Sequence, residues 1–470
     1  MRFRDMTARL RAAIVGWVGP VAVLLAIAAA ASLITTTLLL RGSPGWGYDF
    51  EAYLLAALRL GRGDSLYLPY TLAGAFRAGP FGLYLYAPPL GALLLPVTHL
   101  SVPAATDLWF AARAVLFVGA CAAMPVSRRI RLLTFAAAAA SEPVMTDLNL
   151  GNVSLIVMFL CVVSWRWLDR PAGSIAVAIG MSVRPTLGLF LIWWLLRRRL
   201  APVAWALAAG AVLILVTLPI VGIGGYADYV DMLRNLGGLT GVANNVDLGS
   251  SALQLGLGQA AASVALFAGY AIAVVAVILS LRRDRGVGFM VTLGATLLLS
   301  PLMWDHYLVN LLLPAAFLAH RGRTWALLLP LLAWLPAPSM PILAVGATLL
   351  PFLARPIREA SAPAARYPAW GETEASLRVD SPALPDEAAG EPVLSNRTTA
   401  PTATAALRSV PAGSSTTPAA PRTGMTSPVH GRSDSRTAIT LLAPAPSGAV
   451  TNSASIGKRM KNMWMLVSAR

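Results

Sequence analysis

The chain has 470 residues, of which 57% are hydrophobic and only 12% are charged, and its formal net charge is +16. Soluble domains have about a quarter of their residues charged, so this composition excludes an ordinary soluble enzyme and indicates a multi-span membrane protein. The arginines stand in short clusters between apolar runs, which is typical of cytoplasmic loops and not of a nucleic-acid-binding surface. We therefore expect membrane lipid as a partner and no nucleic acid.

Apolar runs recur along residues 1–355, which we interpret as one membrane domain. The first run, at about 14–40, exceeds the roughly 20 residues that a spanning helix needs and follows a basic N-terminus, so it should leave the cytoplasm. The arginine clusters then favour about twelve spans with both termini cytoplasmic. The later runs lie at 105–126, 131–145, 150–167, 172–183, 186–196, 201–222, 260–281, 287–302, 307–319, 324–336 and 339–354. The short pair 172–183 and 186–196 is alternatively a buried hairpin that does not fully cross.

Two long stretches between these runs, 41–104 and 223–259, are predicted to be external loops. If the short run 90–97 crossed the membrane, the cluster at 128–131 would lie outside, so we expect 90–97 to be an interfacial helix. Residues 356–470 are rich in Pro, Ala, Ser and Thr, which predicts a disordered cytoplasmic tail. The fold class is therefore an all-α polytopic membrane bundle of about twelve spans with a large first external loop.

Two carboxylates, Asp49 and Glu51, follow directly after the first span. An ionisable group at a membrane surface is costly unless it is paired or functional. Asp49 is thus our candidate for a catalytic base, with Glu51 as the runner-up. The alternative is a solvated loop carboxylate.

Two candidate cations fall on the same predicted side. Arg184 stands between two apolar halves and is a candidate ligand for a phosphate group, with snorkelling to lipid headgroups as the alternative. His306, next to Asp305, is a candidate for holding a phosphate or orienting a substrate hydroxyl. The alternative for His306 is a residue of the interfacial belt between Trp304 and Tyr307.

Other polar residues of this predicted outer side are Asp147, Asn149 and Asn152. The segment 244–251, which begins Asn244-Asn245, is a candidate sugar site or a plain turn. We predict no metal site, because no spacing of His, Cys and Asp resembles one, with an assisting divalent ion as the alternative. The lack of a phosphate-binding glycine loop argues against a nucleotide-driven pump.

Several short motifs, taken in order, resemble the polyprenol-phosphate-mannose-dependent α-1,2-mannosyltransferase family, which is glycosyltransferase family 87, once named DUF2029. They are Gly-Tyr-Asp-Phe-x-x-Tyr at 47–53, Leu66-Tyr67, Tyr86-Ala-Pro-Pro89, Gly151-Asn152, Val183-Arg184-Pro185 and Ser300-Pro301-x-x-Trp304-x-His306. The chain departs from the family where Gly151 replaces a frequent Gln and where Arg184 replaces a frequent Lys.

The resemblance implies a GT-C-type bundle whose first external loop carries the catalytic aspartate, a role that maps onto Asp49, while the family's histidine maps onto His306. It implies a polyprenyl-phosphate sugar as the donor, no further cofactor, and a glycolipid or polysaccharide acceptor of the cell envelope. The active site would then face outward from the plasma membrane. Binding roles fall to Glu51, Tyr53, Tyr86, Asn152, Arg184, Asn245, Trp304 and Asp305.

The expected function is the inverting transfer of a hexose, with mannose as the expected sugar. One alternative is a polyprenyl-phosphate arabinofuranosyltransferase of the same architecture. Another is a lipid or sugar transporter, although the internal repeat expected of a transporter is not evident. A scaffold without catalysis would leave the aromatic-rich stretch 41–104 unexplained.

Overall fold

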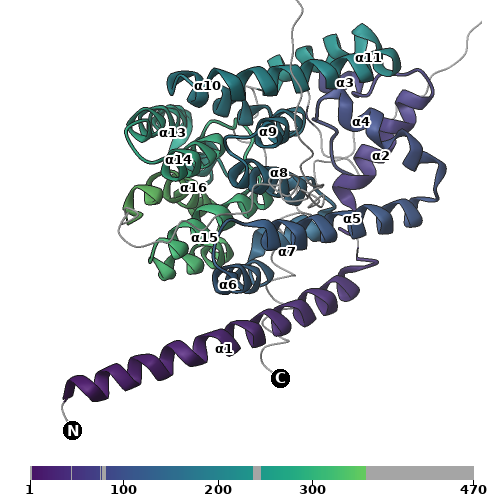
Figure 1. Ribbon diagram of the computed structural model, residues 1–470. Helices are drawn as coiled ribbons and strands as arrows, with labels where there is room; N and C mark the ends of the chain where they lie inside the picture. Colours follow the sequence, from purple (N-terminus) through teal and green to yellow (C-terminus); the bar gives the residue numbers. More distant parts are fainter. Residues whose placement is uncertain (1–2, 44, 75, 77–80, 237–244, 356–470) are drawn as a thin grey trace, which may run out of the picture. The chain divides into compact units, whose positions relative to one another are not determined.

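Every regular element in the described part of the chain is helical (Figure 1). The computed structural model describes residues 3–43, 45–74, 76, 81–236 and 245–355, and all of them belong to one compact unit. The predicted all-α class is therefore confirmed for these residues. The predicted tail at 356–470 and Asn244 lie outside them.

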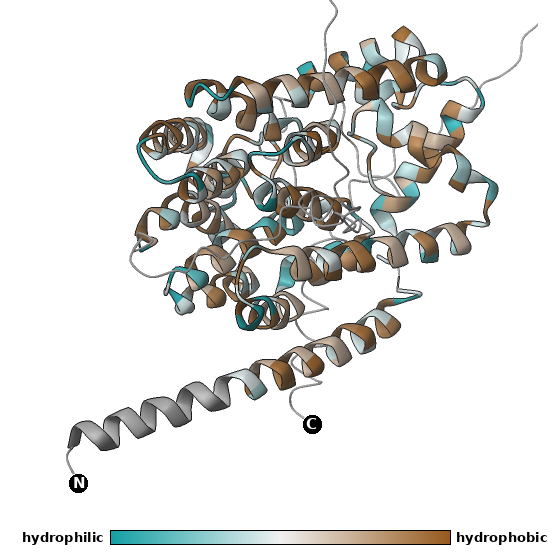
Figure 2. Cartoon of the chain, viewed as in Figure 1, coloured by the Kyte–Doolittle hydropathy of each residue, from teal (hydrophilic) through white to brown (hydrophobic). Residues whose placement is uncertain are grey.

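Four helices are long and apolar enough to cross a membrane: α1 (Phe3–Leu40), α5 (Val102–Ala123), α11 (Leu200–Asn235) and α13 (Gly258–Ser280). Hydrophobic residues cover much of α11 and α13 (Figure 2). Large apolar side chains such as Phe267 are well exposed on these helices, which suits contact with lipid tails and not with water. The protein is thus a multi-pass membrane protein, and the number of about twelve crossings stays a prediction.

The remaining helices are shorter. The α-helices among them are α2 (Tyr48–Gly61), α3 (Pro69–Leu72), α4 (Pro88–Leu94), α6 (Arg128–Ala139), α7 (Glu142–Leu150), α8 (Ser154–Arg166), α9 (Pro171–Val183), α10 (Leu189–Leu196), α12 (Leu248–Gln254), α14 (Arg285–Leu298), α15 (Leu312–His320) and α16 (Met340–Leu349). Short 3-10 helices lie at Leu95–His99, Pro185–Gly188, Asp305–Leu311, Thr324–Trp334, Ala337–Ser339 and Leu350–Leu353.

Two predicted segments differ from the structure. The continuous span at 131–145 is wrong, because the chain breaks after α6 and Pro143 starts a new helix, α7, in its first turn. The predicted loop 223–259 is helical in its first part, because α11 continues past a kink at Gly222 to Asn235. The apolar residues Tyr229 and Leu233 of this extension pack against the core, which stabilises it as a helix.

The core of the unit positions the ends of several helices near one another. α14 lies in the middle of it, between α13 and α16, with Phe289 and Met290 fully buried. α8 packs against α5 and α9, and α2 packs against α4, α5 and α7. As a result, the N-terminal end of α2 meets the connection between α7 and α8.

Aromatic contacts fix this meeting point. The indole of Trp109, on α5, donates a hydrogen bond to the carbonyl of Gly151 over 2.7 Å. The same ring stacks on Phe50 of α2, with ring centroids 5.1 Å apart. Trp109 therefore holds the α7–α8 connection and the start of α2 together from one side.

Candidate functional site

Asp49 lies half-buried in the first turn of α2, where the helix dipole favours a negative charge. The preceding Gly47 has a positive φ of 77°, which glycine adopts readily. The N–H of Gly47 donates to the carbonyl of Asn149 over 2.8 Å. The loop before α2 is thereby attached to the end of α7, and this attachment sets where Asp49 points.

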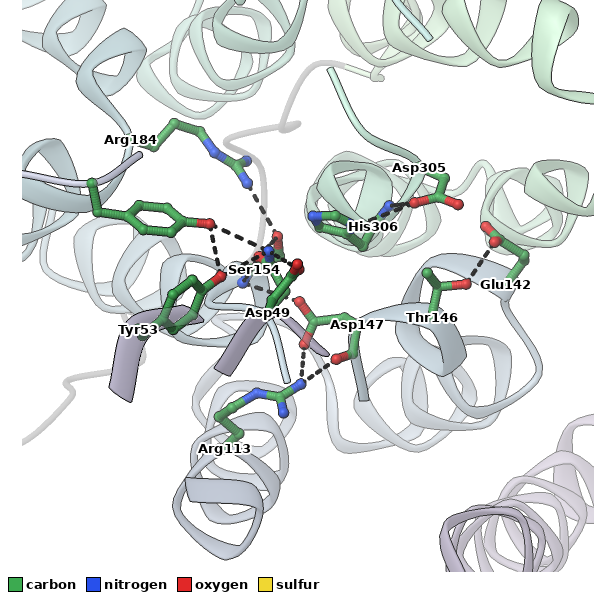
Figure 3. A network of polar contacts seen from close by, with 12 residues as sticks. Asp49, Tyr53, Arg113, Glu142, Thr146, Asp147, Ser154, Arg184, Asp305 and His306 are labelled. Atoms are coloured by element: carbon green, nitrogen blue, oxygen red, sulfur yellow. Dashed lines mark hydrogen bonds and ion pairs between the residues drawn. The ribbon is translucent and has the colours of Figure 1, made fainter. Parts of the chain in front are cut away.

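The side chain of Asn152 joins Asp49 to two tyrosines. Its amide nitrogen lies 2.7 Å from Asp49 Oδ2, 3.1 Å from the hydroxyl of Tyr53 and 3.3 Å from that of Tyr86. The two hydroxyls are 2.9 Å apart, and Asp49 and Tyr53 are labelled in the network of Figure 3. An amide nitrogen has two protons, so one satisfies the carboxylate and the other is left for a phenol oxygen. The predicted site residues Asp49, Tyr53, Tyr86 and Asn152 are therefore in direct contact.

The pKa of Asp49 is raised above the ordinary value of a carboxyl group. Burial is the largest cause, because it disfavours the charged form. The positive charge of a protonated His306 and the hydrogen bond from Asn152 act in the opposite direction. The carboxyl is therefore a stronger base than a solvated aspartate, which suits it to accept a proton.

The backbone at Gly82 passes close to the same carboxylate. A Cβ atom at this position would lie 2.5 Å from Asp49 Oδ1, closer than any real contact. The N–H of Gly82 donates to the carbonyl of Tyr48 over 3.0 Å, which fixes the approach. Only glycine leaves the second oxygen of Asp49 in its present place.

His306 lies beside Asp305 at the start of the 3-10 helix Asp305–Leu311. Its Nδ1 is 3.2 Å from Asp305 Oδ1, which also accepts the backbone N–H of His306 over 2.7 Å. The Nε2 atom is buried and has no hydrogen-bond partner among the described residues. In Figure 3 the imidazole lies between Asp305 and the part of the network that contains Asp49.

The carboxylate of Asp305, next to His306, is stabilised in its charged form. Burial raises the pKa of Asp305, but the hydrogen bonds and charge of His306, together with a hydrogen bond to Glu142, outweigh it, and the pKa is lowered. Glu142 in turn accepts from the hydroxyl of Thr146 over 2.7 Å. Asp305 therefore stays charged and holds Nδ1 of the imidazole, which leaves Nε2 for another group.

Arg184 reaches the network from the end of α9. It is only 5% exposed, its Nη2 donates to Ser154 Oγ over 3.1 Å, and its guanidinium lies 3.7 Å from the ring centroid of Tyr307. Ser154 Oγ in turn donates to Asn152 Oδ1 over 3.1 Å. The Nη1 atom of Arg184 is buried without a hydrogen-bond partner, and no ion pair of this residue is found in the described ranges. A buried cation without a counter-charge favours an anionic ligand.

The ion pair of Arg113 and Asp147 is not predicted by any sequence motif. Both side chains are fully buried, and Nη2 lies 2.5 Å from Asp147 Oδ1. The other oxygen, Oδ2, accepts the N–H of Ser154 over 3.0 Å, directly beside Asn152. The signal in the sequence was an arginine inside the apolar run 105–126 with no acidic residue one helical turn away.

Three predicted residues do not join the network. Glu51 is exposed on α2, and the half-buried side chain of Trp304 makes no hydrogen bond to another described residue. Asn245 is buried, but it holds the loop before Trp304: its Nδ2 donates to the carbonyl of Pro301 over 3.1 Å, and its Oδ1 accepts the N–H of Met303 over 2.9 Å. Asn245 thus binds the backbone of the loop before Trp304.

The groups around Asp49 include hydrogen-bond donors that suit a phosphate or a sugar. Arg184 and His306 supply donors, whereas no group of three or more His, Cys, Asp and Glu residues suited to a metal occurs among the residues described. The family model described as Glycosyltransferase family 87 matches residues 84–301. Residues 84–301 of this chain are thus similar to glycosyltransferase family 87.

The match to glycosyltransferase family 87 indicates the general class of activity. The protein is a membrane glycosyltransferase that acts on a sugar donor and an acceptor. The matched range includes Tyr86, Asn152 and Arg184, whereas Asp49 and His306 lie outside it. No curated protein and no solved structure matches the chain.

The buried ion pair should be costly to break. We expect Arg113→Met to destabilise the protein by about 3–5 kcal/mol, because it leaves the carboxylate of Asp147 buried without its counter-charge. The double variant Arg113→Met/Asp147→Asn should lose less than the single one. Denaturant unfolding in detergent measures both. Arg234→Met, which breaks the exposed pair with Asp231, should stay within about 1 kcal/mol of the wild type.

A methyl group at Gly82 should damage activity without unfolding the protein. Gly82→Ala places Cβ against Asp49 Oδ1 and displaces the carboxylate, so we expect kcat to fall by about 100-fold, the typical effect of a shift of about 1 Å. Gly61→Ala is the matched control on α2, since its Cβ would meet Leu95 at an ordinary 3.5 Å. Equal rates for the two variants would contradict this role of Gly82.

Proposed function

We propose that this enzyme transfers a sugar from a polyprenyl-phosphate donor to an acceptor hydroxyl, with Asp49 as the general base. The observation that carries the proposal is one connected chain of contacts. It runs from the buried cation Arg184 through Ser154 and Asn152 to the carboxylate of Asp49. A group for a leaving phosphate and a group for an attacking hydroxyl are thereby held in one frame.

The chemistry follows from these two groups. The acceptor oxygen attacks the anomeric carbon of the donor sugar and gives its proton to Asp49. The bond between this carbon and the phosphate oxygen breaks, and the polyprenyl phosphate leaves with the electron pair. Arg184 binds the negative charge of that phosphate by bidentate hydrogen bonds. A single carboxylate suffices for such an inverting displacement, by the logic of glycoside hydrolysis.

The neighbouring residues hold these groups in position. Asn152, with Tyr53 and Tyr86, fixes the direction of the Asp49 carboxylate. Asp305 holds Nδ1 of His306, so that Nε2 is left to donate to the phosphate or to a sugar hydroxyl. Each of these positions is set by protein contacts before a substrate arrives, which lowers the cost of orienting it.

We assign mannose as the sugar and a cell-envelope glycolipid or polysaccharide as the acceptor, on the motifs that resemble the mannosyltransferases of this family. An arabinofuranosyl donor is the second candidate. The location of the site on the outer face of the plasma membrane is supported by the helices themselves. α8 begins at Ser154 in the network and ends at Arg166. The helical stretch that contains His306 continues into α15, which ends at His320, directly before Arg321. Clustered arginines favour the cytoplasmic side.

Removal of the base should abolish transfer. In membranes supplied with labelled polyprenyl-phosphate mannose, we expect Asp49→Asn to lower the rate by about 100- to 10,000-fold, the usual contribution of a general base. The control Glu51→Gln should stay within about twofold, because Glu51 is exposed and outside the network. Full activity of Asp49→Asn would refute the proposal, and movement of the labelled lipid without a glycosylated product would favour a transporter.

The pH profile should depend on Asn152. Asp49 must be deprotonated to act, so kcat/KM should fall as the pH drops through its raised pKa. The hydrogen bond from Asn152 lowers that pKa, so its removal in Asn152→Ala raises the pKa further. We expect the acid limb of the profile to move to higher pH, while it stays in place for Glu51→Gln. A limb that stays or moves to lower pH in Asn152→Ala would contradict Asp49 as the base.

A further inference from the structure

A groove with a volume of about 620 Å³ lies between α13 and the helices near residue 350. This volume is in the range of ligand sites, about 300–1,000 Å³. The groove shares no residue with the network around Asp49. Its lining is apolar except for two arginines and consists of Ala271, Ile272, Val275, Ala276, Leu279, Arg282, Arg283, Leu349 and Phe352.

The two arginines of the groove have no recorded ion pair within the described ranges. The acidic residues nearby are already used. Asp284 pairs with Arg321 at 3.2 Å, and Asp169 pairs with Arg199 at 2.6 Å and also with Arg285. The positive charge of Arg282 and Arg283 is therefore left without a carboxylate partner among the described residues.

The apolar residues that α13 contributes to the groove lie within the helix, whereas the two arginines lie beyond its end. Val275 and Leu279 lie within this candidate spanning helix and are 54% and 55% exposed. Arg282 and Arg283 follow just after its last residue, Ser280, where a spanning helix reaches the membrane surface. The guanidinium of Arg283 lies 5.8 Å from the ring centroid of Phe352, at the boundary between the two parts. A ligand of this groove must have an apolar part along α13 and a negative charge next to Arg282 and Arg283.

We propose that this groove binds an anionic phospholipid. One acyl chain lies along Val275 and Leu279, and the phosphate binds Arg282 and Arg283. Basic pockets next to apolar helix surfaces are typical sites for anionic headgroups. A free phosphate compound would leave the apolar lining uncovered, and a zwitterionic lipid would bring its own positive charge to the arginines. Because clustered arginines favour the cytoplasmic side, the groove faces the cytoplasmic leaflet, on the other side of the membrane from the proposed donor.

Native mass spectrometry of the full chain in detergent tests the proposal. We expect phosphatidylglycerol to bind more tightly than phosphatidylcholine with the same acyl chains. Arg282→Gln/Arg283→Gln should weaken the binding of phosphatidylglycerol by about 30-fold, from the usual contribution of two basic residues near a membrane surface. Ala271→Trp, which fills the groove and keeps both charges, should also weaken it. Glycerol phosphate without acyl chains should not compete.

The matched control is Arg128→Gln/Arg129→Gln, which removes an exposed basic pair from the first turn of α6. It should bind phosphatidylglycerol as the wild type does. The proposal is overturned if the two lipids bind the wild type equally, or if the Arg282/Arg283 variant keeps its affinity. It is also overturned if the control loses as much affinity, or if polyprenyl phosphate displaces phosphatidylglycerol from the groove.

Discussion

The amide of Asn152 is the contact on which the rest of the site depends. It links the α7–α8 connection to Asp49 and Tyr53 of α2 and to Tyr86 of the first loop, and through Ser154 it reaches Arg184. Its nitrogen donates only and its oxygen accepts only, so the groups on either side cannot exchange places. An unpaired polar atom in a buried network is costly, so the hydrogen bonds that Asn152 makes favour a single arrangement. That single arrangement holds the carboxylate of Asp49 and the guanidinium of Arg184 at fixed positions relative to each other.

Desolvation explains both the strength and the cost of this arrangement. Burial raises the pKa of Asp49 and so makes it a better base, but the same burial would neutralise it without nearby positive charge. The structure supplies this support in two layers. His306 and Asn152 act on Asp49 directly, and the pair of Arg113 and Asp147 holds the backbone of Ser154 behind them. A fully buried pair contributes little net stability, and its removal would mainly loosen the position of Asn152.

Composition and periodicity were enough to predict an all-α membrane protein, and helices occur at 102–123 and 258–280, where runs 105–126 and 260–281 were predicted. Motif order brought out Asp49, Asn152 and Arg184, which the fold joins. It could not exclude Glu51, because two residues on a helix separate side chains by about 200° and only packing decides which one faces inward. Arg113 was invisible as a site residue, since its partner lies 34 residues away and no local pattern links them. The break in 131–145 was missed because a hydropathy pattern does not weigh Pro143 in a helix's first turn.

The candidate site and the lipid groove have one feature in common, which is a positive charge without a counter-charge among the described residues. Arg184 in the site, and Arg282 with Arg283 in the groove, are positive groups for which the described protein provides no carboxylate. At the buried site such a charge is costly, and it is tolerated where a ligand neutralises it during function. At the exposed groove the cost is small, so the apolar lining beside the arginines is the feature that selects a ligand with both a chain and a charge. A lipid phosphate suits both sites, because it offers an anion and an apolar tail in one molecule. In the two proposals the enzyme binds a lipid phosphate at both sites. Near the carboxylate of Asp49 the lipid phosphate is the leaving group, and in the groove, where no base is present, it is a bound structural lipid.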